Sequence, residues 1–135
     1  MDTQIQSNPQ LFTGLVQMTG SFGYAAGSGG AVTQATNRTT GVTINKLSGT
    51  ITTNNTSLAA EAAAKFTVTN STVAIGDVVL VAQQSGAVGV MTDVVVVAVA
   101  AGSFDISVMN GNAAAGTAET GAILINFIVV KAVSA

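Results

Sequence analysis

The chain of 135 residues contains no cysteine, no histidine, no tryptophan and only one proline. Without cysteine and histidine, it cannot build a disulfide framework, a zinc finger, a thiol nucleophile or a histidine-based catalytic triad. Charge is also scarce, because charged residues make up 7% of the sequence, against about 25% in an ordinary soluble domain. Since the chain has only 4 lysines and arginines, we expect no nucleic-acid partner.

Long hydrophobic runs are missing as well. The longest uncharged apolar run covers only residues 94–102, whereas a membrane-spanning helix needs about 20 residues. The N-terminus has no basic or apolar region of the kind that makes a secretory signal, so we expect no membrane or export segment. Yet 48% of the residues are hydrophobic and the mean hydropathy is +0.57. We therefore expect the chain to bury surface against other chains, as an oligomer or as a subunit of an assembly.

What the sequence does contain is hydrophobicity with a period of two. Apolar residues alternate with threonine or other polar residues in segments 32–36, 42–45, 50–53, 66–69 and 104–109. Such alternation is typical of half-buried strands, and β-branched threonine suits their outer positions. Turn-forming residues separate the segments at spacings found in sandwiches and barrels. We expect an all-β fold over residues 31–135, a single antiparallel, jelly-roll-like β-sandwich of about eight strands.

Four segments depart from this alternation. The valine runs at 78–82 and 94–99 lack it, and we expect strands covered on both faces there. Residues 122–133 predict one long strand with Asn126 inside it. The alanine-rich segment 57–65 has high helix propensity and a possible N-cap, so we expect one short helical turn there.

Residues 1–30 differ from the rest because they are rich in glycine, with apolar residues placed singly. They could form a flexible tail or an extended arm that docks on a neighbouring surface. A solvated tail would not need large apolar side chains, so we favour the arm. Its expected partner-binding anchors are Leu11, Phe12, Phe22 and Tyr24.

Paired carboxylates are the one catalytic device that this composition permits. The acidic candidates are Asp77, Asp93, Asp105, Glu119 and Glu61. We interpret them as serving solubility, turns and protection of strand edges. No calcium-loop spacing occurs. We therefore expect no catalytic residue, no cofactor and no metal, and we expect Arg38 and Lys46 to be solvated.

A family resemblance adds a function. Residues 29–53 read GGAVTQATNRTTGVTINKLSGTITT, which resembles a segment of small structural proteins of tailed bacteriophages, G-x-V-T-Q-x-T-(N/S)-(K/R)-(S/T)-T-G-V-T-(I/L)-N. Segments 66–71, 77–81, 100–104 and 125–131 are similar to the same family. The family includes capsid decoration (cement) and head-fibre proteins, and it offers no catalytic residues to transfer.

The resemblance implies a non-enzymatic virion protein that is made in the host cytoplasm and binds the outer capsid shell. It implies a β-sandwich that acts as a homotrimer, with the major capsid protein as its partner. One alternative is a tail- or head-fibre module that binds a host-surface glycan through its Thr- and Asn-rich turns. Another is a hydrolase that uses Asp77, Asp93 and Asp105.

Overall fold

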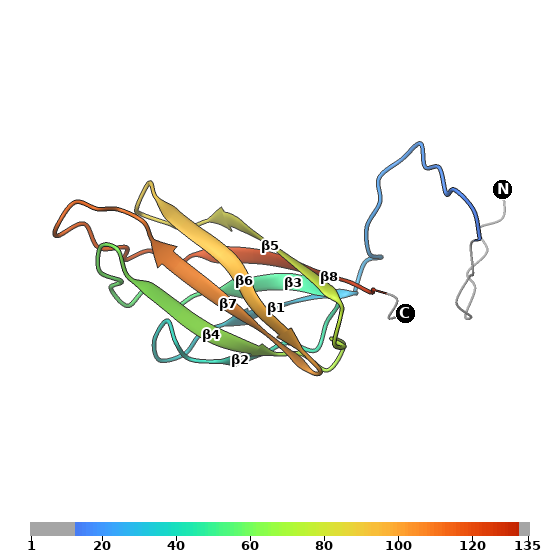
Figure 1. The fold of residues 1–135 in the computed structure, drawn as a ribbon, viewed down its shortest axis with the longest axis horizontal. Helices are drawn as coiled ribbons and strands as arrows, with labels where there is room; N and C mark the ends of the chain where they lie inside the picture. The colour runs from blue at the N-terminus through green and yellow to red at the C-terminus, as the bar shows by residue number, and fades with distance from the viewer. Residues whose placement is uncertain (1–12, 133–135) are drawn as a thin grey trace.

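The computed structural model describes residues 13–132, and all the regular structure in that range is β-strand. The expected anchors Leu11 and Phe12 lie outside the described residues. Eight strands form two four-stranded sheets packed face to face (Figure 1). The strands are β1 (Gly29–Thr33), β2 (Val42–Thr43), β3 (Ser48–Thr52), β4 (Ala63–Thr69), β5 (Val78–Ser85), β6 (Thr92–Ala100), β7 (Ser103–Asn110) and β8 (Leu124–Val130). The predicted all-β sandwich of eight strands is confirmed.

The two sheets are mixed. The first, called sheet A, has the order β1-β3-β8-β5, and the second, sheet B, has the order β2-β4-β7-β6. β1 pairs with β3 and β2 pairs with β4 in parallel, whereas the other pairs are antiparallel. The sequence predicted antiparallel, jelly-roll-like pairing throughout. The chain instead crosses to the opposite sheet after each of β1, β2 and β3, so alternate strands run in the same direction.

The core lies between the sheets and follows the predicted alternation. Along β4, Phe66 and Val68 point inward at 2% and 0% exposure. Phe104 of β7 faces Phe127 of β8 from the opposite sheet, with ring centroids 5.5 Å apart. A tilted aromatic pair at this distance adds stabilisation beyond its buried area. These side chains tie the two sheets together at the centre of the sandwich.

The helical turn expected over 57–65 is absent. Ala59 to Ala62 instead form a turn, closed by the Ala62 N–H and the Ala59 carbonyl, and β4 begins at Ala63. Glu61 adopts a φ of 57° within this turn. Alanine favours helices, but a helix this short is marginal alone. Backbone pairing of β4 with β7 and burial of its inner side chains outweigh that preference.

The valine runs are not covered on both faces, contrary to the prediction. They form β5 and β6, which are edge strands of their sheets. Outward-facing Val78 and Leu80 are 49% and 54% exposed, and Val95 and Val97 are 37% and 49% exposed. An apolar run shows that both faces of a strand are apolar, but a single chain supplies a covering layer for only one of them. β8 is also shorter than the strand expected over 122–133.

The sandwich has two distinct ends (Figure 1). Residues 13–28 contain no strand and leave the sandwich at one end, where the described chain also finishes, and we call this the arm end. The connection between β7 and β8 projects at the opposite end, which we call the loop end. Within residues 13–132 no helix could span a membrane.

Candidate functional site

Asp77 is a structural carboxylate at the arm end. It is 6% exposed and accepts hydrogen bonds from the Ala74 amide at 2.7 Å and the Ala132 amide at 3.3 Å. It also pairs with the Lys131 ammonium group. The hydrogen bond from Lys131, followed by that from Ala74, lowers the pKa of Asp77. This carboxylate therefore closes the turn before β5 and ties it to the end of β8.

Asp105 and Asp93 lie elsewhere on the surface. Asp105 accepts a hydrogen bond from the Thr67 hydroxyl at 2.7 Å and pairs with Lys65 at 3.0 Å. These two contacts, in that order, lower the pKa of Asp105. Asp93 is exposed and accepts a hydrogen bond from the amide of Val94. Among residues 13–132 no hydrogen bond joins two acidic side chains, and no cluster of potential metal ligands occurs.

Arg38 is buried at the loop end, contrary to the expectation of a solvated side chain. It is 4% exposed. Its Nη2 donates to the carbonyls of Glu119 at 3.1 Å and Gly121 at 2.9 Å, and its Nε donates to the Thr56 carbonyl at 2.5 Å. Burial lowers the pKa of Arg38, and the nearby Glu119 charge opposes that shift. The guanidinium fork thus joins the carbonyls of three loop residues, of which Glu119 also accepts a hydrogen bond from the Leu58 amide.

Glu119 is fully buried beside Arg38. Its two oxygens accept hydrogen bonds from the amides of Val88 at 3.0 Å, Gly89 at 2.7 Å and Gly121 at 2.6 Å, and from the Thr92 hydroxyl at 2.5 Å. Burial alone would raise the pKa of Glu119, but these hydrogen bonds outweigh it and hold the pKa at about 2. A carboxylate with this many hydrogen bonds connects the loops around it and is poorly suited to accept a proton.

Gln34 also joins this network, through the backbone of Arg38. Its Nε2 donates to the carbonyls of Arg38 at 3.1 Å and Thr40 at 2.8 Å, and its Oε1 accepts from the Asn54 amide at 3.0 Å. In the described chain, every buried side-chain nitrogen and oxygen has a partner. Gln34 and Arg38 therefore serve the folding of the loop end.

The outer surface of sheet A carries an apolar patch near the arm end. It consists of Val78 and Leu80 of β5, paired across the sheet with Val130 and Ile128 of β8. Val78, Leu80 and Val130 are 49%, 54% and 43% exposed, and Ile128 is half-buried. We call these four residues the apolar face. No charged side chain stands on the outward positions of either strand, which are Val78, Leu80, Ala82, Leu124, Asn126, Ile128 and Val130.

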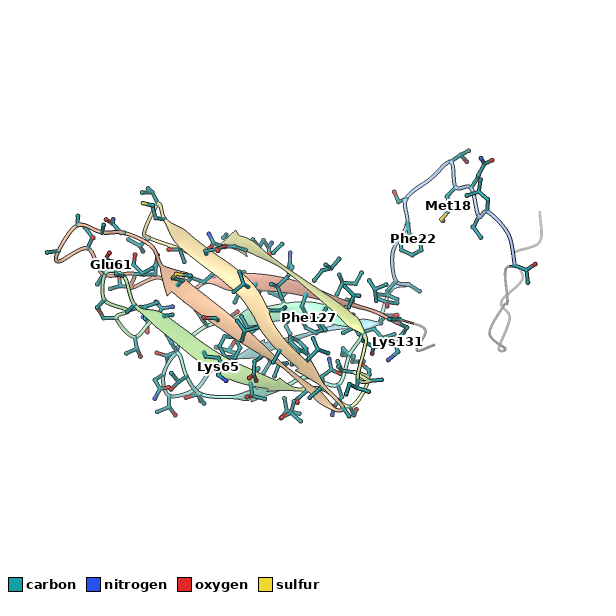
Figure 2. All side chains as sticks on the ribbon, in the orientation of Figure 1. Met18, Phe22, Glu61, Lys65, Phe127 and Lys131 are labelled. Atoms are coloured by element: carbon teal, nitrogen blue, oxygen red, sulfur yellow. The ribbon has the colours of Figure 1, made fainter. Side chains whose placement is uncertain are left out.

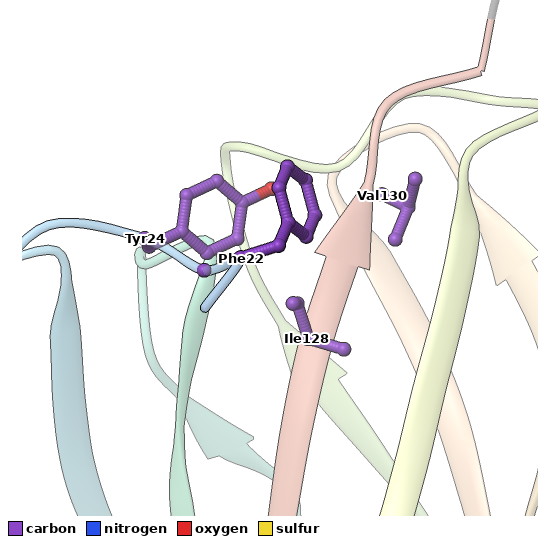
Figure 3. A pocket seen from close by; sticks show the side chains of 5 residues that line it. Phe22, Tyr24, Ile128 and Val130 are labelled. Carbon is purple, nitrogen blue, oxygen red and sulfur yellow. The ribbon is translucent and has the colours of Figure 1, made fainter. Parts of the chain in front are cut away.

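The arm meets the apolar face at its base. Phe22, Gly23 and Tyr24 line a cavity of about 160 Å³ together with Ile128 and Val130 (Figure 3). The Tyr24 hydroxyl donates a hydrogen bond to the backbone carbonyl of Val129, which fixes the ring at the edge of this cavity. Phe22 remains 84% exposed. The structure thus brings two of the four expected anchors to the outer surface of sheet A.

The outer surface of sheet B is polar over most of β4 and β7, although Val95 and Val97 of β6 and Met109 of β7 are exposed there as well. Along β4, exposed Lys65, Thr67 and Thr69 alternate with buried residues, and Asp105 and Ser107 stand beside them on β7. The exposed threonine hydroxyls can form hydrogen bonds with water, and Lys65 and Asp105 pair with each other. The polar groups over β4 and β7 therefore need no covering layer.

The sequence did not single out the four residues of the apolar face. The valine run was the available signal, but it does not show which positions face outward. No protein-family model, curated protein or solved structure matches this chain. The arrangement can bind apolar surface through sheet A, and Asp77, Asp105 and Glu119 are engaged in structural contacts.

Proposed function

We propose that this protein is a non-enzymatic structural protein of a bacteriophage virion. It decorates the outer capsid shell, binds the major capsid protein and stabilises the shell as a homo-oligomer, which we take to be a trimer. The observation that carries this proposal is the uncharged apolar face on a chain that has so few charges overall. The resemblance of residues 29–53 to phage structural proteins supports the same function.

The apolar face suits a protein that is buried in an assembly. Exposed apolar patches on soluble monomers are small, and larger ones mark interaction sites. Leu80 and Val78 are already about half buried in the single chain, so covering the rest of each against a partner contributes about 0.8–1.5 kcal/mol before ordering costs. Repetition of a modest contact over many symmetric positions multiplies its effect. A shell component therefore needs neither a cofactor nor a deep pocket.

Immunogold electron microscopy tests the location. Antibodies raised against the purified protein are applied to particles released from cells that carry the gene, and the particles are also analysed by quantitative mass spectrometry. Gold over the head surface, with many copies per particle, is the expected result. Gold at the tips of tail or head fibres would favour the glycan-binding alternative, and absence from the particles would overturn the proposal.

A further inference from the structure

We infer that the N-terminal arm of each copy docks on the apolar face of a neighbouring copy, so that the oligomer is held together by arm exchange. The segment concerned is residues 13–23, which precede the tyrosine anchored on Val129. This inference deepens the proposed homo-oligomer and rests on that part of the proposed function. It does not depend on binding to a capsid.

The arm carries apolar side chains that find little cover in their own chain. Leu15, Val16, Met18 and Phe22 are 86%, 53%, 56% and 84% exposed. None of them is among the residues packed against the hydrophobic core. Met18 lies beyond the end of the sandwich (Figure 2), whereas Phe22 lies at the base of the arm beside Ile128 and Val130 (Figure 3). A segment of this composition gains most by lying on an apolar surface.

The apolar face offers such a surface in the form of two adjoining hollows. One is the cavity of about 160 Å³ between the base of the arm and β8. The other, of about 170 Å³, is lined by Leu80, Val81, Ala82, Asn126, Phe127 and Ile128. Because Ile128 borders both hollows, they follow one another along the outer surface of sheet A. Their uncharged lining matches residues 13–37, which contain no charged residue.

The path of the arm favours a second copy as the donor. Tyr24 holds the base of the arm at the end of its own β8, and the chain before it runs away from the sandwich (Figure 1). Residues 13–22 in extended form reach about 30 Å, which exceeds the length of about 23 Å expected for a seven-residue strand. The arm can therefore cover a neighbour's apolar face from end to end. Passing an arm from each copy to the next generates a closed ring when a threefold rotation relates the copies, and that ring is a trimer.

Engineered cysteines test this contact directly, because the natural chain contains none. Two variants with different affinity tags are co-expressed: Val16→Cys in the arm and Ala82→Cys beside the apolar face. Both positions are exposed, so folding should be retained. The purified mixture is treated with a short bis-maleimide cross-linker and examined on denaturing gels. The matched control replaces Ala82→Cys with Thr69→Cys, which is exposed on the outer surface of sheet B.

We expect cross-linked species that carry both tags, at least about tenfold more abundant with Ala82→Cys than with Thr69→Cys. Equal yields from the two pairs would overturn the inference. A chain carrying both Val16→Cys and Ala82→Cys that cross-links only within itself would also overturn it, because the arm would then cover its own sandwich. The cross-link can form in a protein that is absent from phage heads, and it can fail in one that decorates them. The two proposals therefore fail separately.

Discussion

The loop end and the apolar face place their side chains in opposite ways. At the loop end, Arg38 and Glu119 are 4% and 0% exposed, whereas on the apolar face Leu80 and Val78 are 54% and 49% exposed. Soluble proteins ordinarily bury such apolar residues and expose such charges. This reversed placement of charged and apolar side chains indicates that the chain uses two of its few charges to fold its loops. It leaves apolar side chains outside, where a partner can cover them.

The two regions also differ in what they require. The loop end joins the segments that follow β1, β3, β5 and β7, in which only some backbone groups are paired with one another, as in the bridge between Leu58 and Glu119. Arg38 satisfies carbonyls there, and Glu119 satisfies amides. The side chains of the apolar face are hydrocarbon and need no hydrogen bonds, and β5 pairs with β8 along one of its two edges. Changes at the loop end should therefore affect folding, and changes on the apolar face should affect association.

The largest effect is expected from Glu119→Gln. The substitution replaces one carboxylate oxygen by an NH₂ group, which cannot accept a hydrogen bond from the Gly89 amide or the Val88 amide. It also leaves the buried Arg38 charge without its nearby countercharge. We expect the free energy of unfolding to fall by about 3 kcal/mol. Urea denaturation followed by far-ultraviolet circular dichroism measures this change in a chain without tryptophan.

The control for that variant is Glu61→Gln, which makes the same chemical change on an exposed turn residue. It should alter the free energy of unfolding by less than about 0.5 kcal/mol. Similar losses in both variants would show that the buried network has no special importance for folding.

Lowering the pH should reduce the free energy of unfolding nearly as much as Glu119→Gln does. Glu119 has a pKa of about 2 in the folded chain, below its ordinary value of 4.5. Between these values the unfolded chain binds a proton that the folded chain does not, so stability rises with pH. The contribution is present above about pH 4.5 and is lost as the pH falls towards 2. The shift corresponds to about 3 kcal/mol.

Denaturation at a series of pH values checks this, with Glu119→Gln as the control that lacks the titrating group. Asp77 and Asp105, whose pKa values are also lowered, supply the dependence that remains. The apolar face contains no titratable group, so the oligomer dissociation constant should not change between about pH 5 and 8. An identical pH dependence of unfolding in the wild type and the variant would contradict the assignment to Glu119.

Much of the fold follows from local pattern. Alternation along β4 and β7 predicted which side chains point inward, because a strand of period two has one apolar side when one face is buried. Local reasoning gave the wrong prediction at 57–65, where alanine propensity favoured a helix. Pairing of β4 with β7, which lies far away in the sequence, decides the structure there. The parallel pairing of β1 with β3 could not be predicted from the sequence either, since it depends on how the chain crosses between the two sheets.

The candidate site was less accessible from sequence. Phe22 and Tyr24 stood out because aromatic residues are rare here. Leu80 did not stand out, because a continuous apolar run gives no clue to its outward positions until the register is known. Arg38 bonds to Glu119, which lies 81 residues away. Its burial therefore leaves no local signal, and an isolated cation near a turn was interpreted as solvated.

Leu80→Asp should produce a smaller change in free energy, and one confined to association. A carboxylate in the middle of the apolar face would be buried without a partner when a neighbouring arm docks. We expect the dissociation constant of the oligomer to rise at least about tenfold, or about 1.4 kcal/mol. Analytical ultracentrifugation over a concentration series measures it. The matched control, Thr69→Asp, places the same charge on sheet B and should leave the oligomer intact, and equal dissociation by both would remove the distinction between the faces.

The smallest effect is expected at the Lys65–Asp105 pair on sheet B. Its nitrogen and oxygen lie 3.0 Å apart, but the Lys65 side chain is 62% exposed. Exposed pairs of this kind contribute about 0.2–1 kcal/mol. A double-mutant cycle with Lys65→Gln and Asp105→Asn should give a coupling energy of about 0.5 kcal/mol that disappears in about 1 M salt.

This cycle also tests whether sheet B is open to water in the oligomer. A pair that a neighbouring copy covers would be shielded from solvent ions, and its coupling energy would exceed about 1 kcal/mol and persist in salt. That result would mean that both outer surfaces of the sandwich are buried against other chains. A weak, salt-sensitive coupling leaves sheet A as the surface that binds and sheet B as the surface that faces solvent.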